Sequence, residues 1–141
     1  MNIILNPGQT DTRKGDITLL ASVDLTGREN QLLKIVNAGG VAKFALPTAI
    51  TDIAPFICAS GDVAGNEVAA EVPSGNENCR VAVNGAVSPG DLLCIDPNAY
   101  GKLYKPAGGS GATVAWFVAE EAAAAGGLCR VRKIGPMAFT P

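Results

Sequence analysis

The chain has 141 residues, enough for one ordinary domain, and its 48% hydrophobic and 17% charged content excludes a disordered tail protein. Its 11 basic and 13 acidic residues give a formal charge of −2, which leaves no basic surface of the size that nucleic-acid binding needs. It contains no histidine, which removes the commonest general base and the commonest metal ligand.

The N-terminal segment, residues 1–16, carries a short apolar run, Ile3, Ile4 and Leu5, and then becomes rich in Pro, Gly, Thr and Asn. It lacks the basic region and the longer apolar stretch of a signal peptide, so we predict no export. No run of eighteen apolar residues occurs in the sequence, and we expect no membrane partner. The three apolar side chains have little reason to face water on a monomer. We predict that this segment is an arm that contacts another chain; folding back over its own domain is the alternative.

Between residues 17 and 134, glycine and proline recur every eight to twelve residues and separate short segments rich in Val, Ile and Leu. This pattern is typical of an all-β domain. The ten predicted strands are 17–23, 31–36, 41–46, 56–59, 67–72, 79–83, 92–95, 102–105, 114–119 and 128–134. Because aromatic residues are few, the core must be built mainly from small aliphatic side chains. We predict a small jelly-roll-like β-sandwich or β-barrel over residues 17–134.

Turn motifs connect several of these strands. Asn37-Ala38-Gly39-Gly40 predicts a hairpin between 31–36 and 41–46. Asn84-Gly85 is a favoured type I′ pair, and Ser88-Pro89-Gly90-Asp91 places Pro and Gly at the central positions of a type II turn. The helix-favouring run 120–125 is only six residues long before Gly126, so it predicts a connector rather than a helix.

The four cysteines are spaced too far apart for a zinc knuckle, because no C-x-x-C pair occurs. Each lies in an apolar or alternating stretch, where a thiol behaves as a small hydrophobe. We predict that they are buried and free, with one or two disulfides as the alternative. The residues are Cys58, Cys79, Cys94 and Cys129. Trp116 and Phe117 are expected to lie in the same core, since large rings supply much of the buried area.

Motifs for catalysis are missing. Ser110 has no imidazole to activate it, and its glycine-rich loop lacks the Lys-Ser/Thr pair of a phosphate loop. The acidic residues are scattered, and we expect solvated loop charges at Asp52, Asp62, Glu67, Glu71, Asp91, Asp96, Glu120 and Glu121. We therefore predict no enzyme, no catalytic residue, no metal and no cofactor. An enzyme would need carboxylates or thiols alone, and its sign would be a lowered cysteine pKa.

The last predicted strand, 128–134, alternates so that Arg130 and Arg132 share one face. Ordinary solubilising charges are one interpretation, and an electrostatic contact with an acidic protein surface is the other. Residues 135–141 follow this strand and carry Met137 and Phe139. We predict that they form a C-terminal tail with the same bridging role as the N-terminal arm.

In the order of its strand and turn motifs, the chain resembles the cement (decoration) proteins of tailed-bacteriophage capsids. The resemblance covers about residues 17–134 and is strongest in the second half. The motifs that carry it are Asn30-Gln31-Leu32-Leu33-Lys34-Ile35, Val41 to Pro47, Ala54 to Cys58, Cys79-Arg80-Val81-Ala82-Val83-Asn84-Gly85, Val87-Ser88-Pro89-Gly90-Asp91-Leu92-Leu93, Gly101-Lys102-Leu103, Val114 to Gly127 and Leu128-Cys129-Arg130-Val131-Arg132.

The resemblance implies a homodimer or homotrimer made in the host cytoplasm that sits on the outer surface of the expanded head. There it would clamp adjacent major capsid proteins, without nucleic acid or membrane as a partner. The residues expected at the capsid or subunit interface are Ile3, Ile4, Leu5, Arg130, Arg132, Met137 and Phe139. A receptor- or glycan-binding β module of a phage tail or fibre is the alternative, although the seven aromatic residues leave few for a sugar platform.

Overall fold

A computed structural model of the chain describes residues 16–99 and 101–141, and within these ranges it contains ten β-strands and no helix. The strands are β1 (Asp16–Ala21), β2 (Leu32–Ala38), β3 (Val41–Ala45), β4 (Phe56–Ser60), β5 (Glu67–Glu71), β6 (Asn78–Ala82), β7 (Leu92–Ile95), β8 (Leu103–Tyr104), β9 (Thr113–Ala119) and β10 (Leu128–Phe139). The all-β class is confirmed, and the ten strands match the ten predicted segments in order. The main difference is the greater length of β10.

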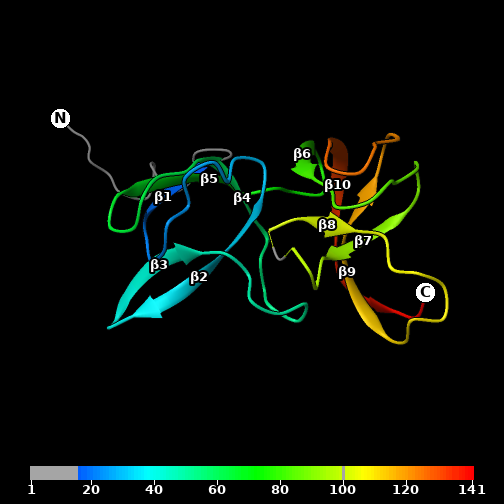
Figure 1. The fold of residues 1–141 in the computed structure, drawn as a ribbon, viewed down its shortest axis with the longest axis horizontal. Coiled ribbons are helices and arrows are strands. Elements are labelled where there is room, and N and C mark those ends of the chain that lie inside the picture. The colour runs from blue at the N-terminus through cyan, green and yellow to red at the C-terminus, as the bar shows by residue number, and fades with distance from the viewer. Residues whose placement is uncertain (1–15, 100) are drawn as a thin grey trace.

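The strands divide by sequence into two halves that lie side by side (Figure 1). The first half closes into a barrel with the order β1-β3-β2-β4-β5, in which only β1 and β3 pair in parallel. The second half is an antiparallel sheet with the order β6-β10-β9-β7-β8. An isolated bridge between Val83 and Leu103 links the two outer ends of this sheet and curls it toward closure.

Local turn chemistry explains most connections. Gly39 and Gly40, with φ of 65° and 88°, join β2 to β3 as the predicted hairpin, because only glycine adopts two successive positive φ values without strain. The type II turn is also confirmed, since Gly90 has φ of 89° and the Asp91 N–H donates to the Ser88 carbonyl oxygen at 3.1 Å. The type I′ prediction at Asn84-Gly85 is wrong. Among the described non-glycine residues only Asn30 has a positive φ, and a type I′ turn needs it at both central positions.

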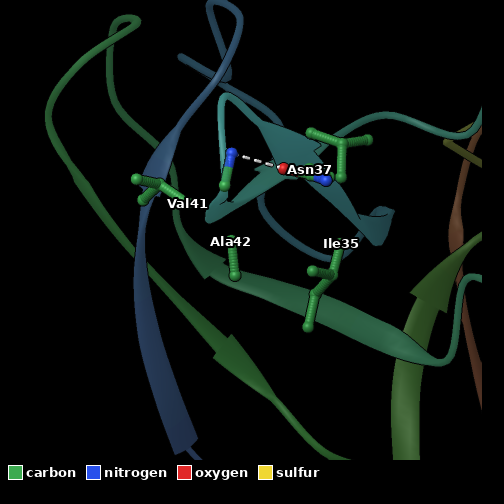
Figure 2. Close-up of a pocket in the computed structure, with 6 residues that line it drawn as sticks. Ile35, Asn37, Val41 and Ala42 are labelled. Carbon is green, nitrogen blue, oxygen red and sulfur yellow. Dashed lines mark hydrogen bonds between the residues drawn. The ribbon is translucent and has the colours of Figure 1, made fainter.

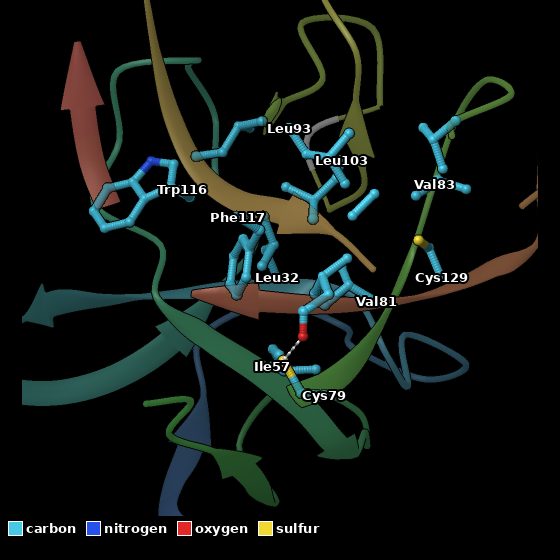
Figure 3. Packing of buried hydrophobic residues seen from close by; sticks show 14 of the residues in the cluster. Leu32, Ile57, Cys79, Val81, Val83, Leu93, Leu103, Trp116, Phe117 and Cys129 are labelled. Atoms are coloured by element: carbon cyan, nitrogen blue, oxygen red, sulfur yellow. Dashed lines mark hydrogen bonds between the residues drawn. The ribbon is translucent and has the colours of Figure 1, made fainter. Parts of the chain in front are cut away.

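Two hydrophobic clusters form the interior. A smaller one fills the barrel and contains Ala21, Leu25, Leu33, Phe44, Cys58, Val68 and Ala70. The larger one is formed mainly by side chains of the second sheet. It includes Trp116 and Phe117, as predicted, together with other residues of β6 to β10 (Figure 3). It also takes in Leu32 and Ile57 from the outer face of the barrel. The two halves are therefore joined by packing as well as by the chain.

All four cysteines are buried and free, which confirms the prediction. Burial raises the pKa of Cys58 to about 11 and, with the help of nearby Glu71 and Glu120, that of Cys79 to about 12. Burial also raises the pKa of Cys94 and of Cys129. Since a thiol reacts as its thiolate, all four are poor nucleophiles at neutral pH.

Most of the segment predicted as a C-terminal tail is strand. After an irregularity between Lys133 and Met137, β10 resumes pairing with β9, and Phe139 lies opposite Thr113. Gly135 lies at this irregularity, and a Cβ there would overlap the carbonyl oxygen of Ala115. The Gly109 N–H donates to the Pro141 carbonyl oxygen at 3.1 Å, so the end of the chain is held against its own second sheet.

Candidate functional site

Within residues 16–99 and 101–141, no group of three acidic or cysteine side chains could hold a metal ion. No helix in those ranges is long and apolar enough to cross a membrane. The raised cysteine pKa values are the opposite of what a nucleophilic thiol would need. Surfaces that could contact another protein are therefore the better candidates for a functional site.

Three of the acidic residues expected to be solvated instead organise turns. Asp96 is buried at 2% exposure and accepts hydrogen bonds from the Asn84 side chain and the Asn98 N–H, both at 2.6 Å. The Asn84 backbone N–H donates to the Leu103 carbonyl oxygen at 2.8 Å, so Asn84 extends the bridge between Val83 and Leu103 instead of starting a type I′ turn. Asp52 in the β3–β4 connection accepts from the Thr48 and Ala49 N–H groups and pairs with Lys34.

Asp91 is the third of these residues. It accepts the Ser88 N–H at 2.8 Å and pairs with Lys105 at 3.0 Å. Its partners lie within its own turn and on the segment just after β8. The partners of Asp96 precede and follow β7 in the sequence. Lys34, the ion-pair partner of Asp52, lies on β2. The contacts with Asn84, Lys34 and Lys105 depend on the tertiary fold, which is why the sequence spacing gave no sign of them.

The predicted basic face of β10 is part of an ion-pair cluster. Arg132 pairs with Glu120 at 2.6 Å, and Arg130 lies 4.0 Å from Glu120 and 3.9 Å from Glu121. Arg80 on β6 pairs with Glu121 at 2.8 Å. The adjacent glutamates were expected to be solvated, but each faces arginines on the neighbouring strands. They directly follow β9 and lie beside β10, where the Glu120 N–H donates to the Arg130 carbonyl oxygen at 2.9 Å.

Hydrogen bonding sets the charge of this cluster. The Arg132 side chain beside Glu120 lowers the pKa of that carboxyl group, and the Arg130 backbone N–H does the same for Glu121. Both glutamates are therefore ionised at neutral pH. Three arginines against two glutamates leave a net charge of +1 on the cluster. Arg130 and Arg132 thus form a largely neutralised patch rather than a strong site for an acidic partner.

The apolar interface residues are placed differently at the two ends of the chain. Ile3, Ile4 and Leu5 lie outside the described residues. Met137 is 40% exposed on β10 and offers an apolar contact. Phe139 is partly buried and lines a cavity of about 230 Å³ with Leu92, Lys105 and Pro141, so its ring mainly fixes the end of β10.

The sequence did not point to the tip of the β2–β3 hairpin as a surface. Ile35 and Val41 are 43% and 52% exposed there, and they line an open cavity of about 400 Å³ with Val36, Asn37, Gly40 and Ala42 (Figure 2). The Asn37 side chain accepts the Gly40 N–H at 2.7 Å and stiffens the turn. Because these two exposed β-branched residues also line a cavity, this hairpin is a second candidate contact surface.

The comparisons with known proteins give a structural likeness. No protein-family model matches the chain, and no curated protein matches it in sequence, so membership of the capsid cement family stays a prediction. Among solved structures, the fold is similar to that described as the head fiber gp8.5 N base in bacteriophage phi29. The TM-score is 0.64 at 17% sequence identity, and the match covers 85% of this chain and 97% of that one. The chain therefore shares its fold with the base of a phage head fiber.

Proposed function

We propose that this chain is a structural protein of a phage virion, attached to the outer surface of the head, where it acts as a cement protein on the major capsid protein. The observation that carries the proposal is the fold likeness to a head-fiber base over nearly the whole of both chains. The motif order that resembles cement proteins supports it independently. The described surface, which offers apolar contacts and buried, protonated thiols, suits binding better than chemistry.

The proposed contact surface combines the apolar run Ile3-Ile4-Leu5 with the exposed Met137 on β10. Arg130 and Arg132 add a weak electrostatic contact, because the cluster keeps a net charge of +1 after internal pairing. Phe139 supports Met137 by anchoring the strand. Copies of the chain would pair as a homodimer or homotrimer on the head, and many such contacts repeated by symmetry would stabilise the shell.

Co-sedimentation with expanded heads that lack this protein tests the proposal. We expect saturation at a fixed ratio of chain to major capsid protein. Met137→Glu should weaken attachment at least about tenfold, since it places a charge in an apolar contact. Ile53→Glu is the matched control, because Ile53 is 72% exposed in the β3–β4 connection and outside the proposed surface. Failure of the unaltered chain to sediment with expanded heads would refute the proposal and favour a receptor- or glycan-binding module.

A further inference from the structure

A cavity of about 480 Å³ lies where the two halves of the molecule meet, and we call it the boundary cavity. The barrel half lines it with Arg28 and Gln31, which precede β2, and with Thr48, which follows β3. The second half lines it with Asn98 and Lys102, which lie between β7 and β8. It shares no lining residue with the β2–β3 hairpin cavity. Its volume is within the range of roughly 300–1,000 Å³ that is typical of ligand sites.

The wall from the second half is fixed to the barrel. The Gly101 carbonyl oxygen accepts the Leu32 N–H at 2.7 Å, which ties the segment between β7 and β8 to the first residue of β2 (Figure 1). A Cβ at Gly101 would overlap the Gln31 side chain, so the two segments are in direct contact. The Lys102 carbonyl oxygen accepts the Asp96 N–H at 2.9 Å and holds Lys102 in the same segment. The boundary cavity is therefore preformed, as most ligand sites are.

The lining of the boundary cavity is positively charged. Arg28 and Lys102 are cationic at neutral pH, and no aspartate or glutamate is among the described lining residues. Over residues 16–99 and 101–141, neither cation forms an ion pair. Arg28 acts only weakly on Asp24, because hydrogen bonds from Thr26 are the main cause of the lowered pKa of Asp24 and the charge of Arg28 is the smallest. Two cations are therefore available to a bound anion.

The acidic residues close to these segments in the sequence are engaged by other groups. Asp52 pairs with Lys34 and accepts two backbone N–H groups after β3. Asp96 is buried and accepts a hydrogen bond from the Asn84 side chain. The hairpin cavity, by contrast, is lined by no charged residue. In a chain with a formal charge of −2, a cavity with two cations and no lining carboxylate is a local site of positive potential.

Neutral groups complete the lining. Leu46, Pro47 and Ala99 offer apolar contacts, and the side-chain amides of Gln31 and Asn98 can donate hydrogen bonds. A guanidinium group binds carboxylates through two parallel hydrogen bonds, and an ammonium group adds a compact charge. This combination suits a carboxylate that is carried on a short aliphatic body.

We propose that the boundary cavity binds such a carboxylate, with Arg28 and Lys102 as its charged partners. Two sources share this chemistry, namely a free dicarboxylate and a glutamate side chain on the major capsid protein. The second source rests on the proposed function and would deepen it, because the capsid contact would then include the boundary between the two halves. The first source does not depend on the proposed function.

Titration of the full-length chain with glutarate tests the free ligand, because this dicarboxylate resembles a glutamate side chain. In amide NMR spectra at low salt, we expect saturable shifts at Thr48 and Lys102, with half-saturation below roughly 10 mM. Lys102→Gln should raise the dissociation constant at least about fivefold, which is the effect of losing one close charge contact in water. Arg28→Gln should act in the same direction. Neither substitution removes an ion pair among the described residues, so both variants should fold.

Lys43→Gln is the matched control, because it removes the same charge from β3 at a position that does not line the boundary cavity. It should bind glutarate like the unaltered chain. Co-sedimentation of the same variants with expanded heads then distinguishes the two sources. Attachment at least about fivefold weaker for Lys102→Gln than for Lys43→Gln would assign the carboxylate to the capsid. Equal attachment, with glutarate binding weakened only in the cavity variants, would assign it to a free ligand.

Two negative results together would overturn the proposal. The first is a glutarate titration without saturable shifts, or with equal affinity for Lys102→Gln and Lys43→Gln, which would indicate attraction by overall charge. The second is equal attachment of these variants to expanded heads. If the unaltered chain does not bind heads at all, the proposed function fails, and the glutarate titration alone decides whether the boundary cavity is a carboxylate site.

Discussion

The two halves of the molecule reach stability by different means. The barrel encloses a small cluster in which Phe44 is the one aromatic ring among its fully buried members, and it leaves Leu20, Ile35, Val41 and Val63 exposed on its strands and loops. The second sheet covers a cluster of fifteen buried residues that includes Trp116 and Phe117. Buried apolar area is the main favourable term in folding, so the second half supplies most of the stability.

The halves nevertheless share one packed boundary. Leu32 and Leu33 are adjacent on β2, yet Leu32 packs into the larger cluster and Leu33 into the barrel. Ile57 and Cys58 divide in the same way on β4. The lesson is that the barrel depends on the second sheet for the burial of its outer face, whereas the second sheet needs the barrel for only a few of its contacts.

The largest test of this comparison replaces the main ring in each core with alanine. We expect Phe117→Ala to reduce the free energy of unfolding by about 4 kcal/mol and Phe44→Ala by about 3 kcal/mol. The second value is smaller because the cluster around Phe44 has fewer buried members than the cluster around Phe117. Urea unfolding followed by far-UV circular dichroism and by the single Trp116 measures both.

The shared boundary predicts that the two signals change together in each variant. A circular-dichroism transition that precedes the Trp116 transition would show that the barrel unfolds on its own. A larger loss for Phe44→Ala than for Phe117→Ala would reverse the comparison itself.

A smaller effect is expected at Gly135 of β10, which lies against the backbone of β9. Gly135→Ala places a Cβ against the carbonyl oxygen of Ala115, a backbone atom that cannot rotate away. We expect a loss of about 2 kcal/mol, in the range of overpacked sites. Gly108→Ala is the control, because no atom lies within 4 Å of its added Cβ and its φ is not positive. Equal unfolding midpoints for the two variants would show that the irregularity in β10 tolerates a side chain.

Charged turns allow a pH-dependent comparison. Although burial opposes ionisation of Asp52, hydrogen bonds from Lys34, Thr48 and Ala49 lower its pKa below the ordinary value. A lowered folded-state pKa gives stability that is fully present above the unfolded value, about 3.9, and is lost as pH falls through the folded value. We expect Asp52→Asn to cost about 1 kcal/mol at pH 7 and almost nothing near pH 2.

Asp91 provides the counterpart in the second half. Its pKa is also lowered, by the Ser88 N–H and Lys105 against the effect of burial. It accepts one backbone N–H where Asp52 accepts two, so Asp91→Asn should cost less at pH 7. Unfolding measured from pH 2 to 7 gives both curves. A cost for Asp52→Asn that did not shrink in acid would mean that shape, and not charge, holds the turn.

The strands could be predicted from sequence because local chemistry sets them. Glycine and proline mark the boundaries, and the hairpin at Gly39-Gly40 needs only its own backbone conformation. The sequence predicted a β-sandwich or a β-barrel, but it did not predict that the first five strands close into a barrel while the last five form a separate sheet. Adjacent apolar pairs such as Leu32-Leu33 do indicate strands buried on both faces. The Asn84-Gly85 prediction failed for another reason, since the Asn84 backbone N–H pairs with Leu103, which is distant in the sequence.

The candidate surfaces were less predictable than the fold. Alternation correctly put Arg130 and Arg132 on one face, but their pairing with Glu120 depends on the register between β9 and β10. Met137 was identified as an apolar contact, yet its place in a strand required knowledge of the pairing with β9.

The smallest effect concerns local opening, and it tests the two cores without altering the chain. Cys58 lies in the barrel, and Cys79 and Cys129 lie in the larger cluster. Labelling with a thiol reagent at pH 8 is expected to be slow for all of them, because each is buried and its pKa is raised. Cys58 should react first, since the barrel has the smaller core and therefore opens at a lower free-energy cost. Peptide mass spectrometry over time gives the order, and labelling in urea, where all four cysteines should react, confirms that they are free. Earlier labelling of Cys79 or Cys129 would place the weaker core in the second sheet, and the stability difference drawn from the size of the two clusters would then be wrong.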